Sequence, residues 1–252
     1  MSSPVKVLES IIAFLQSKAQ KEPVVTGLYA LGEGENSATP AKRQKANDAA
    51  VALLRKLQEN GSTKATDEQK RTLSQYTGTG GNLMDEEGLK GSPYEYYTPV
   101  PVAKAMWDLL AEYGVGSASK VLDPSSGTGI FATTAPSGAL MHSIELSDVS
   151  GNINKLVNDS PTHSVTVSPF EQVAANTDDE TFDTVITNVP FGTNSSRGKN
   201  KQLDAKYQGD SLEVYFILRS LDKLKPGGLA MFITPAKIMS SGSFSKFRQQ
   251  LC

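Results

Sequence analysis

The residues best suited to chemistry lie in two short segments, each of which follows an apolar run. Thr187-Asn188-Val189-Pro190-Phe191-Gly192 follows the run 182–186. Asp123-Pro124-Ser125-Ser126-Gly127-Thr128-Gly129 follows Val121-Leu122, about sixty residues earlier. An Asn-x-Pro-aromatic loop at this distance after a glycine-rich, nucleotide-type loop indicates transfer of a methyl group to a planar, conjugated amino nitrogen. The two segments together indicate this chemistry more strongly than either does alone.

The loop at 188–191 suits an amino group that is a poor nucleophile because its lone pair is delocalised into a purine ring. We expect the side-chain carbonyl of Asn188 and the backbone carbonyl of Val189 to accept its hydrogens and favour a more pyramidal nitrogen. Pro190 would make the turn rigid, and Phe191 would offer a face for an extruded base. Alignment and preorganised dipoles would supply the rate, without a metal or a covalent intermediate. A turn without chemistry is the alternative.

Three further features are expected at the ends of parallel strands, where open sheets bind ligands. Gly127 and Gly129 permit positive φ and a close approach of ligand to backbone, and no Lys-Ser/Thr pair follows them, which excludes a triphosphate loop. Glu145, at the end of the next strand, is placed to accept the hydroxyls of a ribose. Phe170, followed by Glu171, would either lie against a nucleoside base or belong to the core.

A basic segment, 193–207, directly follows the proposed base-binding loop. It places Arg197, Lys199, Lys201 and Lys206 among glycine, serine and asparagine. Such a loop beside an active site would hold substrate phosphates. A solvated loop is the alternative.

Composition limits the other possibilities. The chain has 252 residues and a formal net charge of −2, so nucleic-acid contact must depend on a local patch. Cys252 is the single cysteine, which excludes an intrachain disulfide and a multi-cysteine zinc site, and there are 2 histidines. No metal site is therefore expected. The apolar pattern at the N-terminus is too short to span a bilayer, so we expect a soluble, cytoplasmic protein.

The pattern of elements predicts two regions. Residues 1–90 are expected to form a helical extension, with helices beginning at Thr39-Pro40 and at the capping box Thr66-Asp67-Glu68-Gln69. Residues 91–252 alternate between strands and helices, the first helix capped by Thr98-Pro99. This alternation is typical of an α/β, Rossmann-like, mostly parallel sheet with helices on both faces. The expected strands are 120–122, 140–144, 164–167, 182–187 and 229–233.

These segments resemble S-adenosylmethionine-dependent adenine-N6 DNA methyltransferases, in the subgroup with Tyr97-Thr98-Pro99 before the glycine loop. The chain is similar to the N-terminal methylase region of large phage and mobile-element methylase–helicase polypeptides, which include defence-against-restriction proteins. Further matches are 73–81, Ile144-Glu145-Leu146-Ser147 and 221–228. A valine in place of the first proline of Asn-Pro-Pro-Phe is typical of that subgroup.

The resemblance implies S-adenosylmethionine as cofactor, DNA as partner and a phage or bacterial host setting, with a helicase region or other subunits as further partners. Tyr97, Thr98 and Pro99 would hold the methionine end. The other implied cofactor residues are Asp123, Pro124, Ser125, Gly127, Thr128, Gly129, Glu145, Leu146, Phe170 and Glu171. The implied catalytic residues are Asn188, Val189, Pro190 and Phe191, and the implied nucleic-acid contacts are Arg197, Lys199 and Lys201.

Two departures from the resemblance bear on activity. Thr79 stands where relatives usually have an aromatic residue, and the sequence ends after a helix (244–251) that follows the fifth expected strand. The fold normally continues with two more strands, so we expect a C-terminally truncated methyltransferase domain. Two other readings stay open: a methyltransferase acting on RNA or a glutamine amide, and a non-catalytic module that binds cofactor or DNA.

Overall fold

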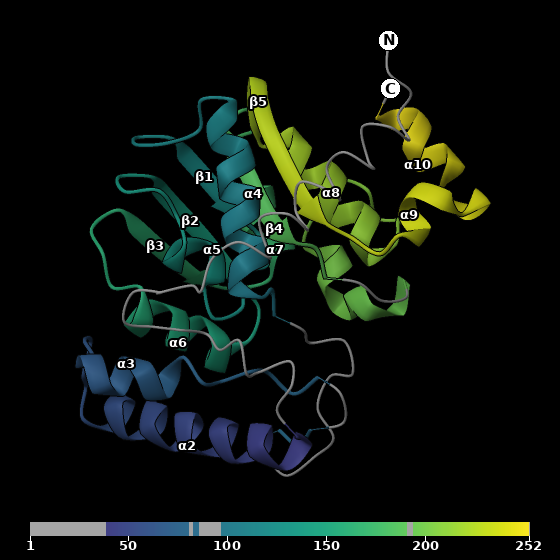
Figure 1. Ribbon diagram of the computed structural model, residues 1–252. Coiled ribbons are helices and arrows are strands. Elements are labelled where there is room, and N and C mark those ends of the chain that lie inside the picture. The colour runs from purple at the N-terminus through teal and green to yellow at the C-terminus, as the bar shows by residue number, and fades with distance from the viewer. Residues whose placement is uncertain (1–38, 81–82, 86–96, 191–193, 252) are drawn as a thin grey trace.

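A computed structural model describes residues 39–80, 83–85, 97–190 and 194–251. The first two helices are α2 (Pro40–Glu59) and α3 (Asp67–Leu73). Thr39 caps α2 by accepting a hydrogen bond from the Lys42 N–H, and Thr66 and Gln69 form the capping box of α3. Both predicted starts are confirmed. Figure 1 shows the two helices packed below α6 (Asp148–Val157), on the side away from the sheet.

The centre of the molecule is a sheet of five parallel strands in the order β3-β2-β1-β4-β5. The predicted α/β class, with a mostly parallel sheet, is confirmed. The strands are β1 (Lys120–Asp123), β2 (Leu140–Glu145), β3 (His163–Val167), β4 (Phe182–Asn188) and β5 (Leu224–Ile233). The remaining helices are α4 (Val100–Glu112), α5 (Ile130–Thr133), α7 (Phe170–Asn176), α8 (Leu212–Asp222), α9 (Lys237–Ser240) and α10 (Ser245–Gln250), with 3-10 segments η1 (Asn194–Gln202) and η2 (Gly242–Phe244).

Helices cover both faces of the sheet. Because consecutive strand residues point to opposite faces, neighbouring residues of one strand pack against different helices. Val121 packs with apolar residues of α4 and α5, whereas the next residue, Leu122, packs with α7 and α8. A third apolar cluster joins α2 and α3 to α6 through Ile153 and neighbouring side chains. The helical extension is therefore attached to the domain by buried apolar contact.

Two predicted boundaries are wrong. Helix α4 has Pro99 as its N-cap and no side-chain capping bond, so Thr98 does not cap it. Strand β5 begins at Leu224, which pairs with Phe182, and not at residue 229. The turn residues 226–228 form an irregularity inside this strand, where Gly227 has φ +80. Local turn chemistry predicted a break, and pairing with β4 continues across it.

A cluster of charges joins α8 to the segment that follows η1. The buried Arg219 donates through Nε to Asp204 (2.7 Å) and through Nη1 to Asp179 (2.8 Å) and Asp222 (3.0 Å). Lys223, also buried, lies 2.7 Å from Asp179. Buried charges are tolerated when they are paired in this way. Among the described helices, none is both long and apolar enough to cross a membrane.

Candidate active site

The glycine loop after β1 has the backbone that its sequence predicts. Gly127 and Gly129 have φ of +53 and +88, in the left-handed region that favours glycine. A Cβ at Gly127 would lie 2.7 Å from the Tyr97 ring, so the ring rests directly on the loop. The Tyr97 hydroxyl is 2.7 Å from Ser150 Oγ on α6. Tyr97 thus joins the loop to the neighbouring helix.

Glu145, at the end of β2, organises the same loop. Its Oε2 accepts the Gly127 N–H (2.7 Å) and its Oε1 accepts the Ser147 N–H (2.8 Å). The side chain is half-buried and borders the cavity. Both carboxylate oxygens thus hold backbone N–H groups at the edge of the cavity.

Asp123 is fully buried at the end of β1 and accepts the Ser125 N–H at 3.3 Å. Burial raises the pKa of its carboxyl to about 7, with a smaller contribution from the charge of Glu145. Hydrogen bonding from Thr187 and Ser125 acts in the opposite direction. Asp123 therefore shapes the loop from beneath instead of bordering the cavity.

Asn188 ends β4, beside β1 in the sheet. The next residue, Val189, buries its side chain in the core and donates its N–H to the Ile233 carbonyl of β5 (3.0 Å). Pro190 then restricts the backbone. The strand pair consequently fixes the position of the Asn188 and Val189 carbonyl groups. Phe191 lies outside the described residues.

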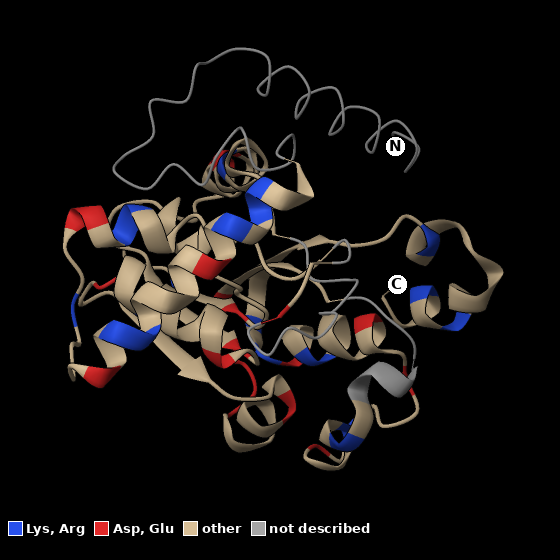
Figure 2. Cartoon of the chain, turned by 90° about the horizontal axis from the view of Figure 1, so that it is seen from below, with Lys and Arg blue, Asp and Glu red and all other residues tan. Residues whose placement is uncertain are grey.

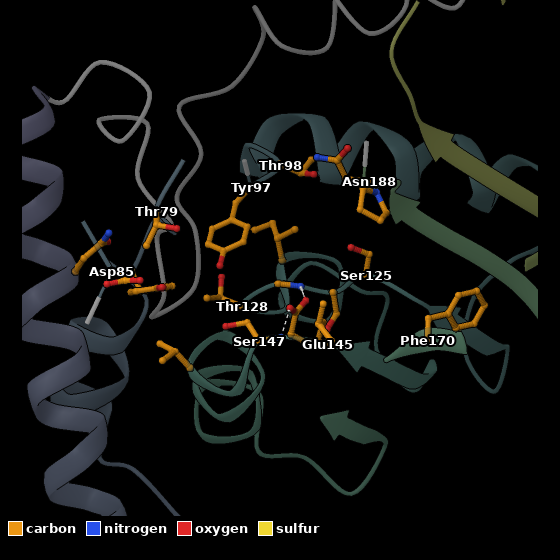
Figure 3. Close-up of a pocket in the computed structure, with 18 of the residues that line it drawn as sticks. Thr79, Asp85, Tyr97, Thr98, Ser125, Thr128, Glu145, Ser147, Phe170 and Asn188 are labelled. Atoms are coloured by element: carbon orange, nitrogen blue, oxygen red, sulfur yellow. Dashed lines mark hydrogen bonds between the residues drawn. The ribbon is translucent and has the colours of Figure 1, made fainter. Parts of the chain in front are cut away.

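These strand ends border one cavity of about 710 Å³ (Figure 3). It brings together most of the residues that the sequence singles out. The ones that line it are Tyr97, Thr98, Pro124, Ser125, Gly127, Thr128, Glu145, Leu146, Phe170, Glu171, Asn188, Val189 and Pro190. Pro99, Asp123 and Gly129 do not line it. In the described part of the chain, no group of three or more His, Cys, Asp or Glu side chains is placed to hold a metal ion.

The C-terminal part of the chain matches a known protein family. Residues 132–252 match the model of the Eco57I restriction-modification methylase family. The chain carries a methylase domain of this family. The matched residues include Glu145 and the Asn188 segment, while the glycine loop precedes them.

A curated relative covers most of the chain. The chain is 39% identical, over 224 residues and 88% of its length, to "Defense against restriction protein B" of Escherichia phage P1. The match spans 9% of that protein's length. The two proteins are homologues over this region.

A solved structure supports the fold independently. The chain matches a putative class I S-adenosylmethionine-dependent methyltransferase from Listeria monocytogenes with a TM-score of 0.54 and 18% identity, covering 98% of this chain and 79% of that one. At this identity the likeness shows the fold of the methylase domain, a class I methyltransferase sheet.

The apolar part of the cavity lies around Leu146 and Phe170. Leu146 is 63% exposed, unusual for a large apolar side chain. Phe170 is buried, with ring centroids 5.0 Å from Phe216 and 6.0 Å from Tyr215. The ring thus packs in the core of the methylase domain while the residue borders the cavity, so both sequence readings have support. Contact between this ring and a base stays a prediction.

The sequence analysis does not predict that α2 forms a wall of the same cavity. Its Gln44, Asn47, Asp48, Val51, Ala52 and Arg55 line the space, as do Tyr76, Thr79, Met84 and Asp85. The extension looked like an appendage because its polar residues form no catalytic or binding motif. One signal was available: Asn47 occupies the apolar stripe formed by Ala50, Leu54 and Leu57, where a polar residue must find a partner.

The basic segment divides into two parts. Lys199 and Lys201 are exposed on η1, while the side chain of Arg197 lies outside the described residues. Lys206, which the sequence groups with them, pairs with Asp179 (2.9 Å) and Asp222 (3.1 Å). Lys206 therefore belongs to the charge cluster around Arg219. Figure 2 shows Lys and Arg interspersed with Asp and Glu in this view, consistent with the small net charge.

Proposed function

We propose that the methylase domain transfers a methyl group from S-adenosylmethionine to the exocyclic N6 of adenine in DNA. One observation carries the proposal: the glycine loop, Glu145 and the Asn188-Val189-Pro190 segment border a single cavity at the ends of adjacent strands. A nucleoside-binding half and an amino-binding half are thereby within reach of one ligand.

The cavity suits the chemical parts of this cofactor. Leu146 offers apolar surface to a base, and Glu145 offers acceptors to ribose hydroxyls. The hydroxyls of Thr98 and Thr128 are buried, border the cavity and have no hydrogen-bond partner among the residues that the structure describes. Buried polar groups without partners are rare in proteins, so these hydroxyls fit a polar ligand group such as an amino-acid end.

The acceptor side of the cavity is built to activate an amino group. When bound, S-adenosylmethionine supplies a methyl group on positively charged sulfur, and transfer to the amino nitrogen releases one proton from that nitrogen. Asn188 would accept one N–H through its side-chain carbonyl, and Val189 the other through its backbone carbonyl. Because Val189 is anchored to Ile233, these acceptors are preorganised, which is the main source of rate in such sites.

DNA is the acceptor that the comparisons favour. The family model is that of a restriction-modification methylase, and the phage P1 relative is called a defence-against-restriction protein. We therefore propose an anti-restriction modification, carried out together with a helicase region or other subunits. Arg197, Lys199 and Lys201 would contact DNA phosphates beside the active site.

Incubation with methyl-tritiated cofactor tests the proposal, with unmodified DNA, RNA and a protein substrate in separate reactions. Label should enter DNA, and nucleoside analysis of the digested product should identify N6-methyladenine. Label in RNA or in a glutamine side chain would instead identify RNA or protein as the methyl acceptor. Cofactor binding without any labelled acceptor would support a non-catalytic module.

A further inference from the structure

Two amide side chains on α2 bind the backbone of nearby described residues in the stretches 77–80 and 83–85. Asn47, which is 3% exposed, donates to the Gly78 carbonyl (2.8 Å) and accepts the Thr77 N–H (2.9 Å). Gln44, one turn earlier, donates to the Met84 carbonyl (3.2 Å) and accepts the Met84 N–H (2.9 Å). Each amide thus replaces a backbone partner, and together they fix the backbone at residues 77–78 and at Met84.

Described residues next to these attachments face the ligand space. Thr79 and Asp85 line the cavity, and Thr79 is 8% exposed. Figure 3 places them next to α2, with Tyr97, Thr128 and Ser147 between them and Glu145. Phe170 lies beyond Glu145, on the side away from α2, and Asn188 lies above Glu145, beside Thr98. Along the line from α2 to Phe170, Glu145 is central and α2 lies at one end.

The two ends differ in chemistry. The far end has the apolar surfaces of Leu146, Phe170 and Phe216, which suit a base. The end next to α2 has the hydroxyl of Thr79 and the carboxylate of Asp85, with the hydroxyl of Thr128 between them and Glu145. A carboxylate among hydroxyl groups complements an ammonium group in a confined site. This polar group has no apolar surface on which a purine ring could pack.

We infer that the helical extension closes the cavity over the amino-acid end of the cofactor, with Asp85 and Thr79 contacting that end and Asn47 acting as the positioning residue. The inference rests on the proposed function, since it assumes that the cavity binds S-adenosylmethionine. It adds a binding surface that comes from outside the strand–helix domain. The extension then contributes to affinity for the intact cofactor and not for its nucleoside part.

Two ligands separate these contributions. S-Adenosylhomocysteine has the adenosine and the amino-acid group, and 5′-methylthioadenosine has the adenosine and sulfur without the amino-acid group. Calorimetry would measure both ligands against wild type, Asn47→Ala and Asp85→Asn. Gln58→Ala changes an exposed amide on the same helix that does not line the cavity, and serves as control. A thermal melt without ligand would report on folding.

Asn47→Ala and Asp85→Asn should each weaken S-adenosylhomocysteine binding about tenfold and change methylthioadenosine binding less than about twofold. Gln58→Ala should change neither. Equal losses for both ligands, or no loss for either, would overturn the inference while wild-type binding leaves the proposed function standing. Wild type that binds neither ligand would overturn both. If Asn47→Ala unfolds, the comparison depends on Asp85→Asn alone.

Discussion

The strand-end half of the cavity and the α2 half are built by different means. At the strand ends the backbone sets the geometry: Gly127 and Gly129 adopt positive φ, and Glu145 binds N–H groups of the loop. At α2, side-chain amides set the geometry by binding the backbone of Gly78 and Met84. The first kind of construction restricts residue type at fixed positions, so it leaves a pattern in the sequence. The second kind needs only suitably placed amides.

The largest expected effect is at Asp123, beneath the strand-end half. With its pKa at about 7 in the folded protein and near 4 when unfolded, the folded state holds a proton that unfolding releases. The free energy of unfolding should therefore fall as pH rises from about 4 to about 7, by up to about 4 kcal/mol. Chemical denaturation of Asp123→Asn across this range should show a flatter pH dependence.

Asp178→Asn, on an exposed loop, is the matched loss of one carboxylate and should keep the wild-type slope. An Asp123→Asn variant with the same slope as wild type would show that burial does not control this group.

The next effect is on catalysis. Asn188→Ala should reduce methyl transfer by a hundredfold or more, because a lost preorganised contact costs about 3–4 kcal/mol. Affinity for S-adenosylhomocysteine should stay unchanged, since the contact is to the acceptor base. Asn176→Ala, an exposed amide at the end of α7, is the control. An Asn188→Ala variant with normal activity would remove the amino-group mechanism.

Glu145→Ala tests the ribose contact. Loss of hydrogen bonds to a carboxylate typically costs about 1.5–3 kcal/mol, so affinity should fall by roughly tenfold to a hundredfold by calorimetry. Unlike the changes in the α2 half, this loss should be the same for S-adenosylhomocysteine and methylthioadenosine. Equal binding by wild type and Glu145→Ala would exclude Glu145 from the site.

In the α2 half the two amides should differ in stability. Asn47→Ala leaves buried backbone groups of Thr77 and Gly78 unpaired and should cost about 1–3 kcal/mol. Gln44→Ala should cost less than about 1 kcal/mol, because water can replace its exposed bonds to Met84. Urea denaturation compares the two. A larger cost for Gln44→Ala would contradict the assignment of Asn47 as the principal attachment.

The smallest effect lies outside both halves. Replacing Arg197, Lys199 and Lys201 by alanine should weaken DNA binding and reduce the log–log salt slope by up to about three. Titrations at several salt concentrations would measure it, with Lys56→Ala on α2 as a single-charge reference. An unchanged slope would assign the segment to solvent.

The sequence predicted the sheet, and most of the residues it singled out at the strand ends border one cavity, for a physical reason. Positions such as Gly127 and Glu145 are restricted by backbone conformation and strand position, and a single chain displays those restrictions. Thr98 was misassigned because a hydroxyl before proline satisfies the rules for a helix cap as well as those for a ligand contact. The wall at α2 depends on which helix face meets the domain, and tertiary packing decides that.

The charge cluster around Arg219 has a consequence for how the protein can vary. Asp204 is anchored to Arg219, and Pro190 follows a residue anchored to β5, so the stretch between them is fixed at both ends. Exchanging that stretch for one of another length should cost little stability, since closure entropy grows slowly with loop length. Under the proposed function, relatives that differ in this stretch would differ in their DNA contacts while the cavity keeps its geometry. The stretch could therefore be replaced, in evolution or by engineering, without rebuilding the residues that line the cavity.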